Sequence, residues 1–316
     1  MAREGCHVRT VRVNATVPAV LVLAGPTASG KTEAALALAE RFDAEIIGAD
    51  SRQIYCGMPI GTAAPTPAQR ARAPYHLVAF LDPHERYSAA RYVRDALAAV
   101  AGIHARGRRA IVAGGTGFYL RALCGDVVLA REFAPALRAR LEREAAIHPP
   151  EVLHEWLRAR DPQRAASVPP GDAYRIVRAL EIALARATGV AAAELPEPPS
   201  SLRARGLAVH KVVLAVDEAE LDARIVARVD AMLAAGLLEE AERVGPGAVA
   251  ADAVGYPQAL AYLAGASTAD ELRAALIRAT RRYAKRQRTW FRSEPHVTYL
   301  EAEALADAAR GLPGWA

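Results

Sequence analysis

Short apolar runs alternate with helical patterns in the first part of the chain. Continuous apolar runs at 19–24, 44–49 and 109–113 predict strands that are buried on both faces. Between these runs, segments 31–42 and 89–106 place apolar residues at the 3.6-residue spacing of an amphipathic helix. Buried strands that alternate with helices predict an α/β fold, in which helices cover both faces of a parallel sheet.

The pattern changes in the middle of the chain and then returns. Segments 134–146, 150–159 and 173–188 have helical patterns with no strong strand among them, and Pro-rich stretches separate them. The alternation resumes near the C-terminus, where we expect strands at 209–216 and 296–300 and helices at 219–235 and 269–291.

This change of pattern predicts two domains. We expect a core domain formed by residues 17–125 and 205–316, and a helical insertion domain at 126–204. Residues 1–16 are expected to be a disordered extension. A chain of 316 residues buries a sizeable core without disulfide bonds.

Composition narrows the class of protein without deciding its function. The chain is 52% hydrophobic and 24% charged, as globular proteins are, and its longest apolar run is too short to cross a bilayer. The three cysteines show neither CxxC nor zinc spacing, which fits a reduced, cytoplasmic protein. The net charge of +5 suits a polyanionic partner, but the preference for Arg over Lys equally reflects genome composition.

The strongest motif lies between the first expected strand and the first expected helix. It matches G-x-x-x-x-G-K-[ST] and comprises Gly25, Pro26, Thr27, Ala28, Ser29, Gly30, Lys31 and Thr32. The backbone N–H groups and helix N-terminus of such a loop bind phosphate oxygens. Lys31 is expected to neutralise the terminal phosphate, and the Thr32 hydroxyl to coordinate Mg²⁺. The loop recognises a diphosphate, either of ATP or of another Mg²⁺-bound pyrophosphate ester.

Two further strand ends carry polar residues. Asp50 follows the second expected strand, at the sheet edge where ligands bind, and is a candidate general base or magnesium partner. The alternative is a turn or helix-capping aspartate. Gly114, Gly115 and Thr116 follow the third strand, where glycines permit close approach of a ligand and Thr116 offers a hydroxyl. A tight strand-to-helix turn is the alternative there.

Together these motifs resemble the tRNA dimethylallyltransferase family, also called tRNA isopentenyltransferases. The resemblance covers nearly the whole chain after residue 17, and rests on GPTASGKT at 25–32, ADSRQIY at 49–55, MPIGTAAP at 58–65, AGGTGFYLRAL at 113–123, DAYRIVRALEI at 172–182, GY at 255–256 and AKRQRTWFR at 284–292. It implies a phosphate-loop kinase-like core with a helical insertion domain. The implied activity is transfer of a dimethylallyl group from dimethylallyl diphosphate, with Mg²⁺, to N6 of adenosine 37 in tRNA.

The resemblance also implies roles for individual residues. Asp50 would take a proton from the adenine amine, Thr116 would support the pyrophosphate or adenine, and Arg224 would lie near the pyrophosphate beside Lys31. The implied tRNA contacts are Asp50, Ser51, Arg52, Gln53, Thr116, Arg138, Arg175, Arg178, Gly255, Tyr256, Lys285, Arg286, Gln287, Arg288, Trp290 and Arg292. Cations and aromatic residues interleaved in the last segment suit contacts to phosphates and bases.

The sequence departs from the family pattern at two positions. Ala64 stands where the family commonly has lysine, and Pro257 stands where Arg or Lys usually follows the GY pair. Both changes put individual binding contacts in doubt. We expect a monomer, since no leucine-rich seam suggests a dimer. The alternatives are a phosphate-loop small-molecule kinase or NTPase, with Asp217 as a Walker-B aspartate, and an adenylate prenyltransferase acting on free nucleotide.

Overall fold

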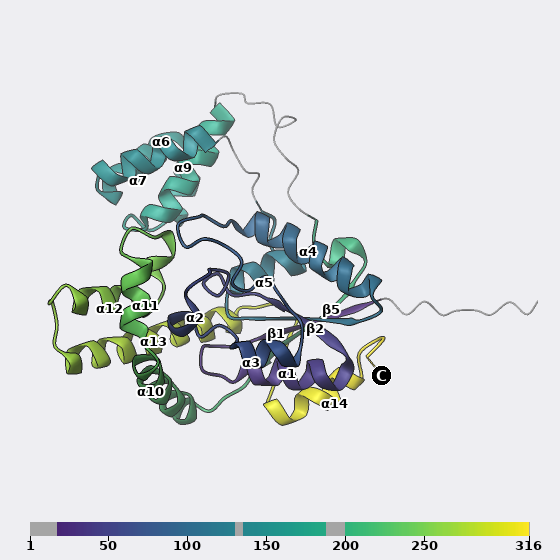
Figure 1. Ribbon diagram of the computed structural model, residues 1–316. Coiled ribbons are helices and arrows are strands. Elements are labelled where there is room, and N and C mark those ends of the chain that lie inside the picture. Colours follow the sequence, from purple (N-terminus) through teal and green to yellow (C-terminus); the bar gives the residue numbers. More distant parts are fainter. Residues whose placement is uncertain (1–17, 130–134, 188–199, 316) are drawn as a thin grey trace, which may run out of the picture. The chain divides into compact units, whose positions relative to one another are not determined.

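The computed structural model describes residues 18–129, 135–187 and 200–315, and the chain divides into two compact units (Figure 1). The core unit comprises Met1–Val127 and Ser200–Ala316, and the insertion unit comprises Val128–Pro199. The sequence pattern changes near the same positions. The extension expected at 1–16 lies outside the described residues.

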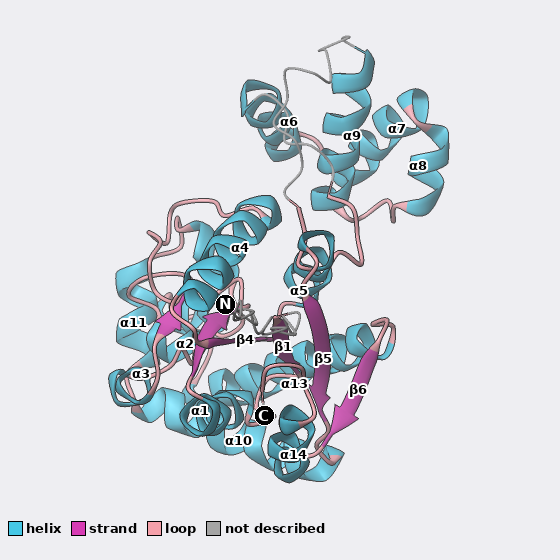
Figure 2. Ribbon diagram, turned by 90° about the vertical axis from the view of Figure 1, so that its right-hand side faces the viewer, coloured by secondary structure: helices cyan, strands magenta, loops and turns pink. Residues whose placement is uncertain are grey.

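A six-stranded parallel sheet forms the centre of the core unit (Figure 2). Its order is β3-β2-β4-β1-β5-β6, with β1 paired to β4 on one side and to β5 on the other. Every residue of β1 is buried, as its apolar run predicts. The strands are β1 (Ala19–Ala24), β2 (Ala44–Gly48), β3 (Tyr75–His76), β4 (Arg109–Gly114), β5 (Ala208–Leu214) and β6 (Val297–Leu300). The parallel α/β fold expected from the sequence is confirmed.

Helices cover both faces of this sheet (Figure 1). On one face lie α1 (Lys31–Phe42) and α14 (Leu305–Arg310), where Leu36 and Phe42 of α1 and Trp315, which follows α14, are buried against apolar strand residues. On the other face lie α4 (Ala89–Ala105) and α5 (Gly117–Cys124). Apolar contact with helices on both sides explains why the strands carry unbroken apolar runs.

A further group of helices packs beside the sheet around an apolar cluster of its own. Residues such as Met58, Leu237, Tyr256 and Leu276 form this cluster, together with neighbours from the same helices. The helices are α2 (Pro59–Thr62), α10 (Glu218–Ala234), α11 (Leu237–Val244), α12 (Tyr256–Leu263) and α13 (Ala269–Arg292), and α3 (Pro67–Arg72) follows α2 along the chain. A capping box starts α13, with Thr268 and Glu271 satisfying each other's backbone N–H groups.

The insertion unit is helical throughout its described residues. It contains α6 (Pro135–Ile147), α7 (Pro150–Arg160), α8 (Pro162–Ser167) and α9 (Ala173–Ala187). Leu153, Leu157, Ile176 and Leu180 form its small core with their neighbours. The helices expected at 134–146, 150–159 and 173–188 are thus confirmed to within a residue or two.

The chain leaves and re-enters the core unit at one point. The Leu202 N–H donates to the Leu123 carbonyl at 2.9 Å, which holds the two connecting segments side by side. Below them, the buried Lys211 ammonium binds Asp126 at 2.8 Å and Glu294 at 2.9 Å. One cation therefore ties together strand β5, the segment just before the insertion and the segment just after α13.

Short helices were not expected from the sequence. Helices α2, α3, α8, α11 and α12 span four to eight residues each, too few turns for a periodic pattern to stand out. Proline occupies the first turn of α2, α3, α8 and α12, where its missing N–H costs nothing. Across the parts of the chain that the structure describes, no helix is long and apolar enough to span a membrane.

Candidate active site

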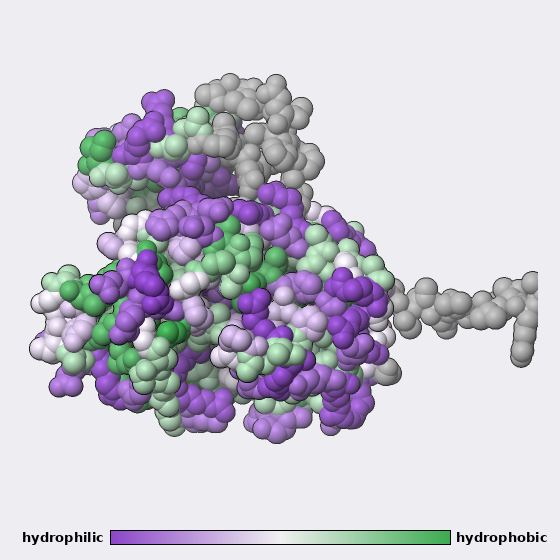
Figure 3. All heavy atoms as spheres, in the orientation of Figure 1, coloured by the Kyte–Doolittle hydropathy of each residue, from purple (hydrophilic) through white to green (hydrophobic). Residues whose placement is uncertain are grey.

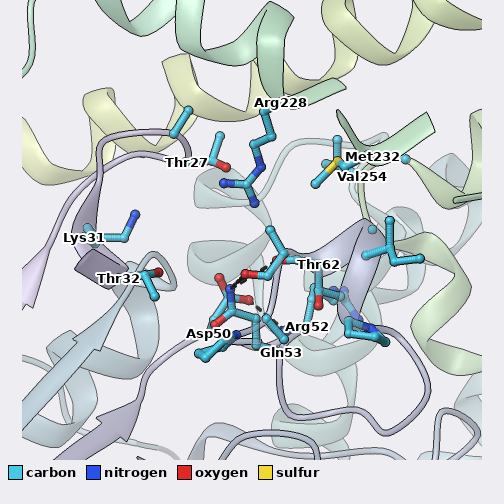
Figure 4. Close-up of a pocket in the computed structure, with 18 of the residues that line it drawn as sticks. Thr27, Lys31, Thr32, Asp50, Arg52, Gln53, Thr62, Arg228, Met232 and Val254 are labelled. Carbon is cyan, nitrogen blue, oxygen red and sulfur yellow. Dashed lines mark hydrogen bonds between the residues drawn. The ribbon is translucent and has the colours of Figure 1, made fainter. Parts of the chain in front are cut away.

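Three neighbouring strands bring their polar C-terminal ends to one edge of the sheet. Strands β2, β4 and β1 lie side by side, so Asp50, the Gly114–Thr116 turn and the phosphate loop meet there. These segments line a cavity of about 1080 Å³. Figure 4 shows Thr27, Lys31 and Thr32 on one side of this pocket and Asp50 beneath it. The sequence predicted this meeting of strand ends, and the structure forms it.

The phosphate loop starts helix α1 and holds Lys31 in the pocket wall. Gly30 caps the helix with a φ of 87°, so the following N–H groups point out of the helix end. The Lys31 Nζ donates to the Pro26 carbonyl at 2.6 Å. Burial lowers the pKa of Lys31 to about 7; nearby Asp50 opposes this shift and nearby Arg228 adds to it. An anion in the pocket would restore the charge of this ammonium group.

Hydrogen bonds fasten the Asp50 segment to the turn after β4. The Thr116 Oγ1 accepts from the Ser51 N–H at 2.9 Å, and the Thr116 N–H donates to the Ala49 carbonyl at 3.1 Å. One Asp50 oxygen, Oδ1, accepts from the Arg52 N–H at 2.9 Å. The other oxygen has no hydrogen-bond donor among the described residues, and Asp50 lines the pocket. It can therefore accept a proton from a bound substrate.

The glycines after β4 are required by close packing. A Cβ at Gly114 would lie 2.1 Å from the Ala49 carbonyl oxygen, and one at Gly115 would lie 2.3 Å from the Gln287 Nε2. The Gln287 amide donates to the Gly115 carbonyl at 2.9 Å and accepts from the Thr27 N–H at 2.7 Å. Gln287 is buried, and both ends of its amide are used within the protein. Gln287 therefore joins the phosphate loop to the turn after β4, and its expected contact with tRNA stays a prediction.

Two arginines reach this pocket from α10. Arg224 is held by Glu220 at 2.6 Å, and its Nη1 lies 3.5 Å from the position that a Cβ would take at Gly30. It thus stands beside the phosphate loop, as the resemblance implied. Arg228, one turn further, points into the middle of the pocket (Figure 4). Arg228 was not expected as a site residue, although its spacing of four from Arg224 places both on one helix face.

The far wall of the pocket is held by a buried carboxylate. Glu240 is fully buried, and it accepts hydrogen bonds from the N–H groups of Ile60 and Gly61 at 2.9 and 2.7 Å and from the Tyr256 hydroxyl at 2.7 Å. Tyr256 is also fully buried. The expectation that Tyr256 contacts tRNA is therefore wrong for its side chain, which fixes α2 and α12 instead.

The same wall is largely apolar. Ile60, Val229, Met232, Val254 and Leu276 line the pocket, and Met232 and Val254 lie across it from Lys31 (Figure 4). Gln53 supports it by donating to the Thr62 and Ala63 carbonyls at 3.1 and 3.0 Å, so part of its amide is used inside the protein. In the surface view, apolar residues also gather around α11 and α12 (Figure 3). The pocket thus pairs a phosphate-binding end with an apolar end.

The outer face of α13 is cationic, but salt bridges to α10 neutralise part of it. Arg281 binds Asp222 at 2.6 Å, and Arg288 approaches Glu218 at 3.3 Å. Lys285, Arg286 and Arg292 have no carboxylate within ion-pair distance among the described residues. Trp290 packs against Gly117. The Arg121 guanidinium lies over the Trp290 ring, with its Cζ 4.4 Å from the ring centroid. The cations of α13 therefore divide into paired and unpaired groups.

Asp217 does not act as a Walker-B aspartate. Its Oδ1 accepts from the N–H groups of Ala219 and Glu220 at 2.8 and 3.2 Å, and so caps helix α10. It does not line the pocket. The feature that suggested a kinase or NTPase is a helix cap.

The three expected tRNA arginines of the insertion unit all have acidic partners. The buried Glu181 accepts from Arg138 at 3.2 Å and from Arg178 at 2.5 Å. Arg175 binds Asp172 at 2.9 Å. These three arginines therefore lie in one helical unit, and each is paired with a carboxylate.

The described residues fit a magnesium ion only in company with a phosphate ligand. They contain no group of three or more His, Cys, Asp or Glu side chains arranged to hold a metal. The pocket instead offers the Thr32 hydroxyl beside the phosphate loop, with Asp50 across from it. Mg²⁺ commonly binds through one or two protein oxygens, waters and substrate phosphates, which suits this arrangement.

The chain is similar to known proteins along almost its whole length. The IPP transferase family matches residues 53–294. A tRNA dimethylallyltransferase of Anaeromyxobacter sp. (strain K) is 48% identical over 300 residues, which cover 91% of this chain and 95% of that protein. A tRNA dimethylallyltransferase of Salinispora tropica is 44% identical over 320 residues, covering 98% and 95% respectively.

Solved structures show the same likeness. The full-length tRNA isopentenylpyrophosphate transferase from Bacillus halodurans superposes with a TM-score of 0.64 at 34% identity, covering 90% of each chain. A eukaryotic dimethylallyltransferase acting on tRNA gives a TM-score of 0.71 at 26% identity, covering 90% of this chain and 74% of that one. The α/β core and these likenesses define a prenyltransferase of the tRNA-modifying kind. The chain belongs to the tRNA dimethylallyltransferase family, which confirms the resemblance of its motifs.

Proposed function

We propose that this protein transfers a dimethylallyl group from dimethylallyl diphosphate to N6 of adenosine 37 in tRNA. In this reaction the N6–carbon bond forms, the carbon–oxygen bond to the diphosphate breaks, and pyrophosphate leaves. The amine loses a proton to Asp50. The observation that carries the proposal is the pocket itself, where a phosphate loop, a carboxylate with a free oxygen and an apolar wall face one another.

The phosphate loop is proposed to hold the diphosphate. Lys31, Arg224 and the loop N–H groups would match the negative charge that grows on pyrophosphate as it leaves, which is the charge that most needs stabilising. Thr32 is the proposed protein ligand of Mg²⁺. When bound, Mg²⁺ would neutralise phosphate charge and make pyrophosphate a better leaving group.

Asp50 is proposed as the general base. An adenine amine is a weak nucleophile because its lone pair is delocalised into the ring, so loss of its proton must accompany attack. The hydrogen bonds of Ser51 and Arg52 fix the backbone around Asp50 and leave one carboxylate oxygen for the amine. Thr116, held against Ser51, keeps this segment at the strand end.

The apolar wall is proposed to hold the dimethylallyl group. Met232 and Val254 lie across the pocket from Lys31 (Figure 4), and Val229 also lines it, so a diphosphate at the loop would direct its hydrocarbon toward this apolar wall. Contact with these side chains removes the reacting carbon from water, which limits hydrolysis of the allylic diphosphate.

A tRNA acceptor is favoured over a free nucleotide by the surfaces outside the pocket. Lys285, Arg286 and Arg292 on α13 and the arginines of the insertion unit offer cations to phosphates beyond the reacting nucleotide. The target adenosine must leave its stack to reach Asp50 at the sheet edge. A free adenylate would have no use for these additional contacts.

The decisive experiment supplies dimethylallyl diphosphate and Mg²⁺ with three acceptors in parallel: unmodified tRNA, AMP and ATP. Transfer to tRNA, located at adenosine 37 by nuclease digestion and mass spectrometry, is the expected outcome. Prenylation of AMP with none of tRNA would establish the adenylate prenyltransferase instead. Phosphoryl transfer from ATP, with no prenylation of any acceptor, would support the alternative that the protein is a kinase.

The proposal includes a monomeric enzyme in the cytoplasm, where tRNA is its substrate. Light scattering during gel filtration, at low micromolar concentration and with and without tRNA, tests the first part. A molar mass twice that of the chain would replace the monomer by a dimer.

A further inference from the structure

Helix α13 forms part of the pocket wall, and one of its side chains there keeps an unused hydrogen-bond donor. The residues of α13 that line the pocket are Leu276, Thr280, Tyr283, Arg286 and Gln287. Leu276 is apolar, and the Thr280 hydroxyl donates to the Leu276 carbonyl at 2.9 Å. Both ends of the Gln287 amide are used within the protein. Tyr283 is therefore the uncharged member of this group that can still donate to a ligand.

The surroundings of Tyr283 keep its hydroxyl protonated. Within the part of the chain that the structure describes, this hydroxyl has no hydrogen-bond partner. Burial raises the pKa of Tyr283, and so does the negative charge of Asp50. The neighbouring Arg52, Arg286 and Arg228 act in the opposite direction and do not cancel this rise. The hydroxyl is therefore a neutral donor at physiological pH, and it lies in the neighbourhood of the proposed general base.

A cation on the surface side of α13 contacts the ring of Tyr283. The Arg286 guanidinium lies over this ring, with its Cζ 5.6 Å from the ring centroid. Arg286 is exposed, and it has no carboxylate within ion-pair distance in the ranges that the structure describes. It can therefore bind an RNA phosphate outside the pocket. The two side chains together lead from a phosphate contact at the surface to a hydroxyl donor in the pocket.

The neighbourhood of Asp50 indicates which part of a substrate Tyr283 meets. In adenine, the ring nitrogens N1 and N7 flank the exocyclic N6 amine, and both are hydrogen-bond acceptors. An amine placed at Asp50 brings these nitrogens toward the side chains around that carboxylate. We infer that the Tyr283 hydroxyl donates a hydrogen bond to one of these two ring nitrogens of the target adenine, and so holds the amine against Asp50. This inference rests on the proposed function and adds recognition of the acceptor base to it.

Adenine analogues test this hydrogen bond at each ring nitrogen separately. An anticodon stem-loop is synthesised with adenosine, 1-deazaadenosine or 7-deazaadenosine at the target position, so that each analogue replaces one ring nitrogen by C–H. Tyr283→Phe removes the hydroxyl and keeps the ring, and should lower kcat/KM for the adenosine stem-loop about tenfold. With the analogue that lacks the contacted nitrogen, wild type and Tyr283→Phe should react equally fast. With the other analogue, the difference between the two proteins should remain.

Tyr299→Phe is the matched control, because Tyr299 is a half-exposed tyrosine on β6 that does not line this pocket. It should prenylate all three stem-loops like wild type. Calorimetry should give the same affinity of wild type and Tyr283→Phe for inorganic pyrophosphate with Mg²⁺, since the hydroxyl meets the base. The two ligand-free proteins should also melt at the same temperature, because the hydroxyl has no partner to lose within the described residues.

Several outcomes would overturn the inference. One is an equal rate of wild type and Tyr283→Phe on the adenosine stem-loop, and another is a difference that persists with both analogues. Weaker pyrophosphate binding by Tyr283→Phe would assign the hydroxyl to the diphosphate, and a much lower melting temperature would assign it to the fold. Failure of the proposed function appears instead in wild type. If wild type prenylates AMP and no tRNA, the same deaza analogues of AMP test the hydrogen bond; if it prenylates neither, both proposals fall.

Discussion

The pocket of the core unit and the helices of the insertion unit use arginine in opposite ways. In the insertion unit, Arg138 binds both Glu142 and the buried Glu181, and Arg178 binds Glu181, so each has a carboxylate within hydrogen-bond distance before any partner binds. In the pocket, Asp50 is the nearby carboxylate for both Lys31 and Arg228, and among the described residues neither cation has a carboxylate within ion-pair distance. The arrangement in the insertion unit stabilises a small group of helices. The arrangement in the pocket leaves two cations without an ion-pair partner.

The two arrangements are expected to bind phosphates differently. A paired arginine is held in one orientation, whereas an unpaired cation attracts the phosphate by its charge. A balanced arginine presents its remaining donors in one direction, but attracts a phosphate weakly because a carboxylate lies beside it. An unbalanced one in a pocket attracts an anion more strongly, because no carboxylate within ion-pair distance competes for it. The pocket is therefore expected to respond strongly to a small anion, whereas the insertion unit should respond only to an extended one.

Removal of Asp50 is expected to have the largest effect. Asp50→Asn should slow single-turnover prenylation by about 10²–10⁴-fold, the usual loss when a general base is removed. Pyrophosphate affinity should be retained or tightened, because the negative charge of Asp50 no longer competes for Lys31 and Arg228. Asp252→Asn is the control, since Asp252 lines the same pocket but pairs with Arg52 at 2.9 Å. An unchanged rate in Asp50→Asn would assign the base elsewhere.

Replacement of Lys31 is expected to have the second largest effect on the rate of prenylation. Lys31→Met should cost about 3 kcal/mol of transition-state stabilisation, as loss of one preorganised donor to an anion does. With a pKa of about 7, Lys31 is largely neutral at pH 8 in the free protein and must gain a proton when the diphosphate binds. Wild type should therefore take up more protons on binding than Lys31→Met.

Calorimetry of pyrophosphate binding at pH 8, repeated in buffers of different ionisation enthalpy, measures this uptake. The affinity of wild type relative to Lys31→Met should also decline as the pH rises above 7, since protonation becomes harder. Equal proton uptake by both proteins would show that Lys31 is already charged in the empty pocket.

In the insertion unit the expected effect is on stability. Glu181→Gln leaves Arg138 and Arg178 without their shared carboxylate and should lower the free energy of unfolding by about 1–3 kcal/mol, a typical cost for charged hydrogen bonds. Affinity for tRNA should stay the same or increase, because a negative charge beside Arg138 and Arg178 is removed, although Arg138 keeps Glu142 at 2.8 Å. Urea unfolding and fluorescence anisotropy check the two parts. Weaker tRNA binding by a folded variant would mean that Glu181 orients these arginines for the RNA.

The smallest effect is expected on the outer face of α13. Replacing Arg281, Arg282 and Arg286 together by Gln should reduce the slope of log affinity for tRNA against log salt by about one to two units. Arg281→Gln alone should leave the slope unchanged, because Asp222 already neutralises Arg281. Anisotropy titrations at several KCl concentrations measure both slopes. If the single variant accounts for the whole change, the division of these cations into paired and unpaired groups fails.

The sheet could be predicted well because its strands are buried on both faces. The apolar runs at 19–24 and 109–113 correspond to β1 and β4, and α1 spans Lys31–Phe42 as its periodicity indicated. The elements that were missed are the two-residue β3 and the short helices. These form through tertiary contacts, such as the hydrogen bonds from Glu240 to the backbone of α2, which leave no local pattern.

The position of a site residue could be predicted where the neighbouring sequence alone determines it. The phosphate loop and Asp50 follow strands, so their meeting at one edge follows from parallel pairing alone. Gln287 and Tyr256 belong to motifs that suggested tRNA contact, yet their side chains are buried and used within the protein. Which face of α13 or α12 a residue occupies depends on distant segments, and so does the unbalanced charge of Arg228.

The crossing of the two connecting segments makes the insertion a removable module. Because the Leu202 N–H meets the Leu123 carbonyl, a loop of a few residues would bridge the gap that its excision leaves. Neither the sheet order nor the phosphate loop requires the intervening helices. Excision of residues 128–199, with a short linker in their place, is therefore expected to leave the sheet and the phosphate loop folded.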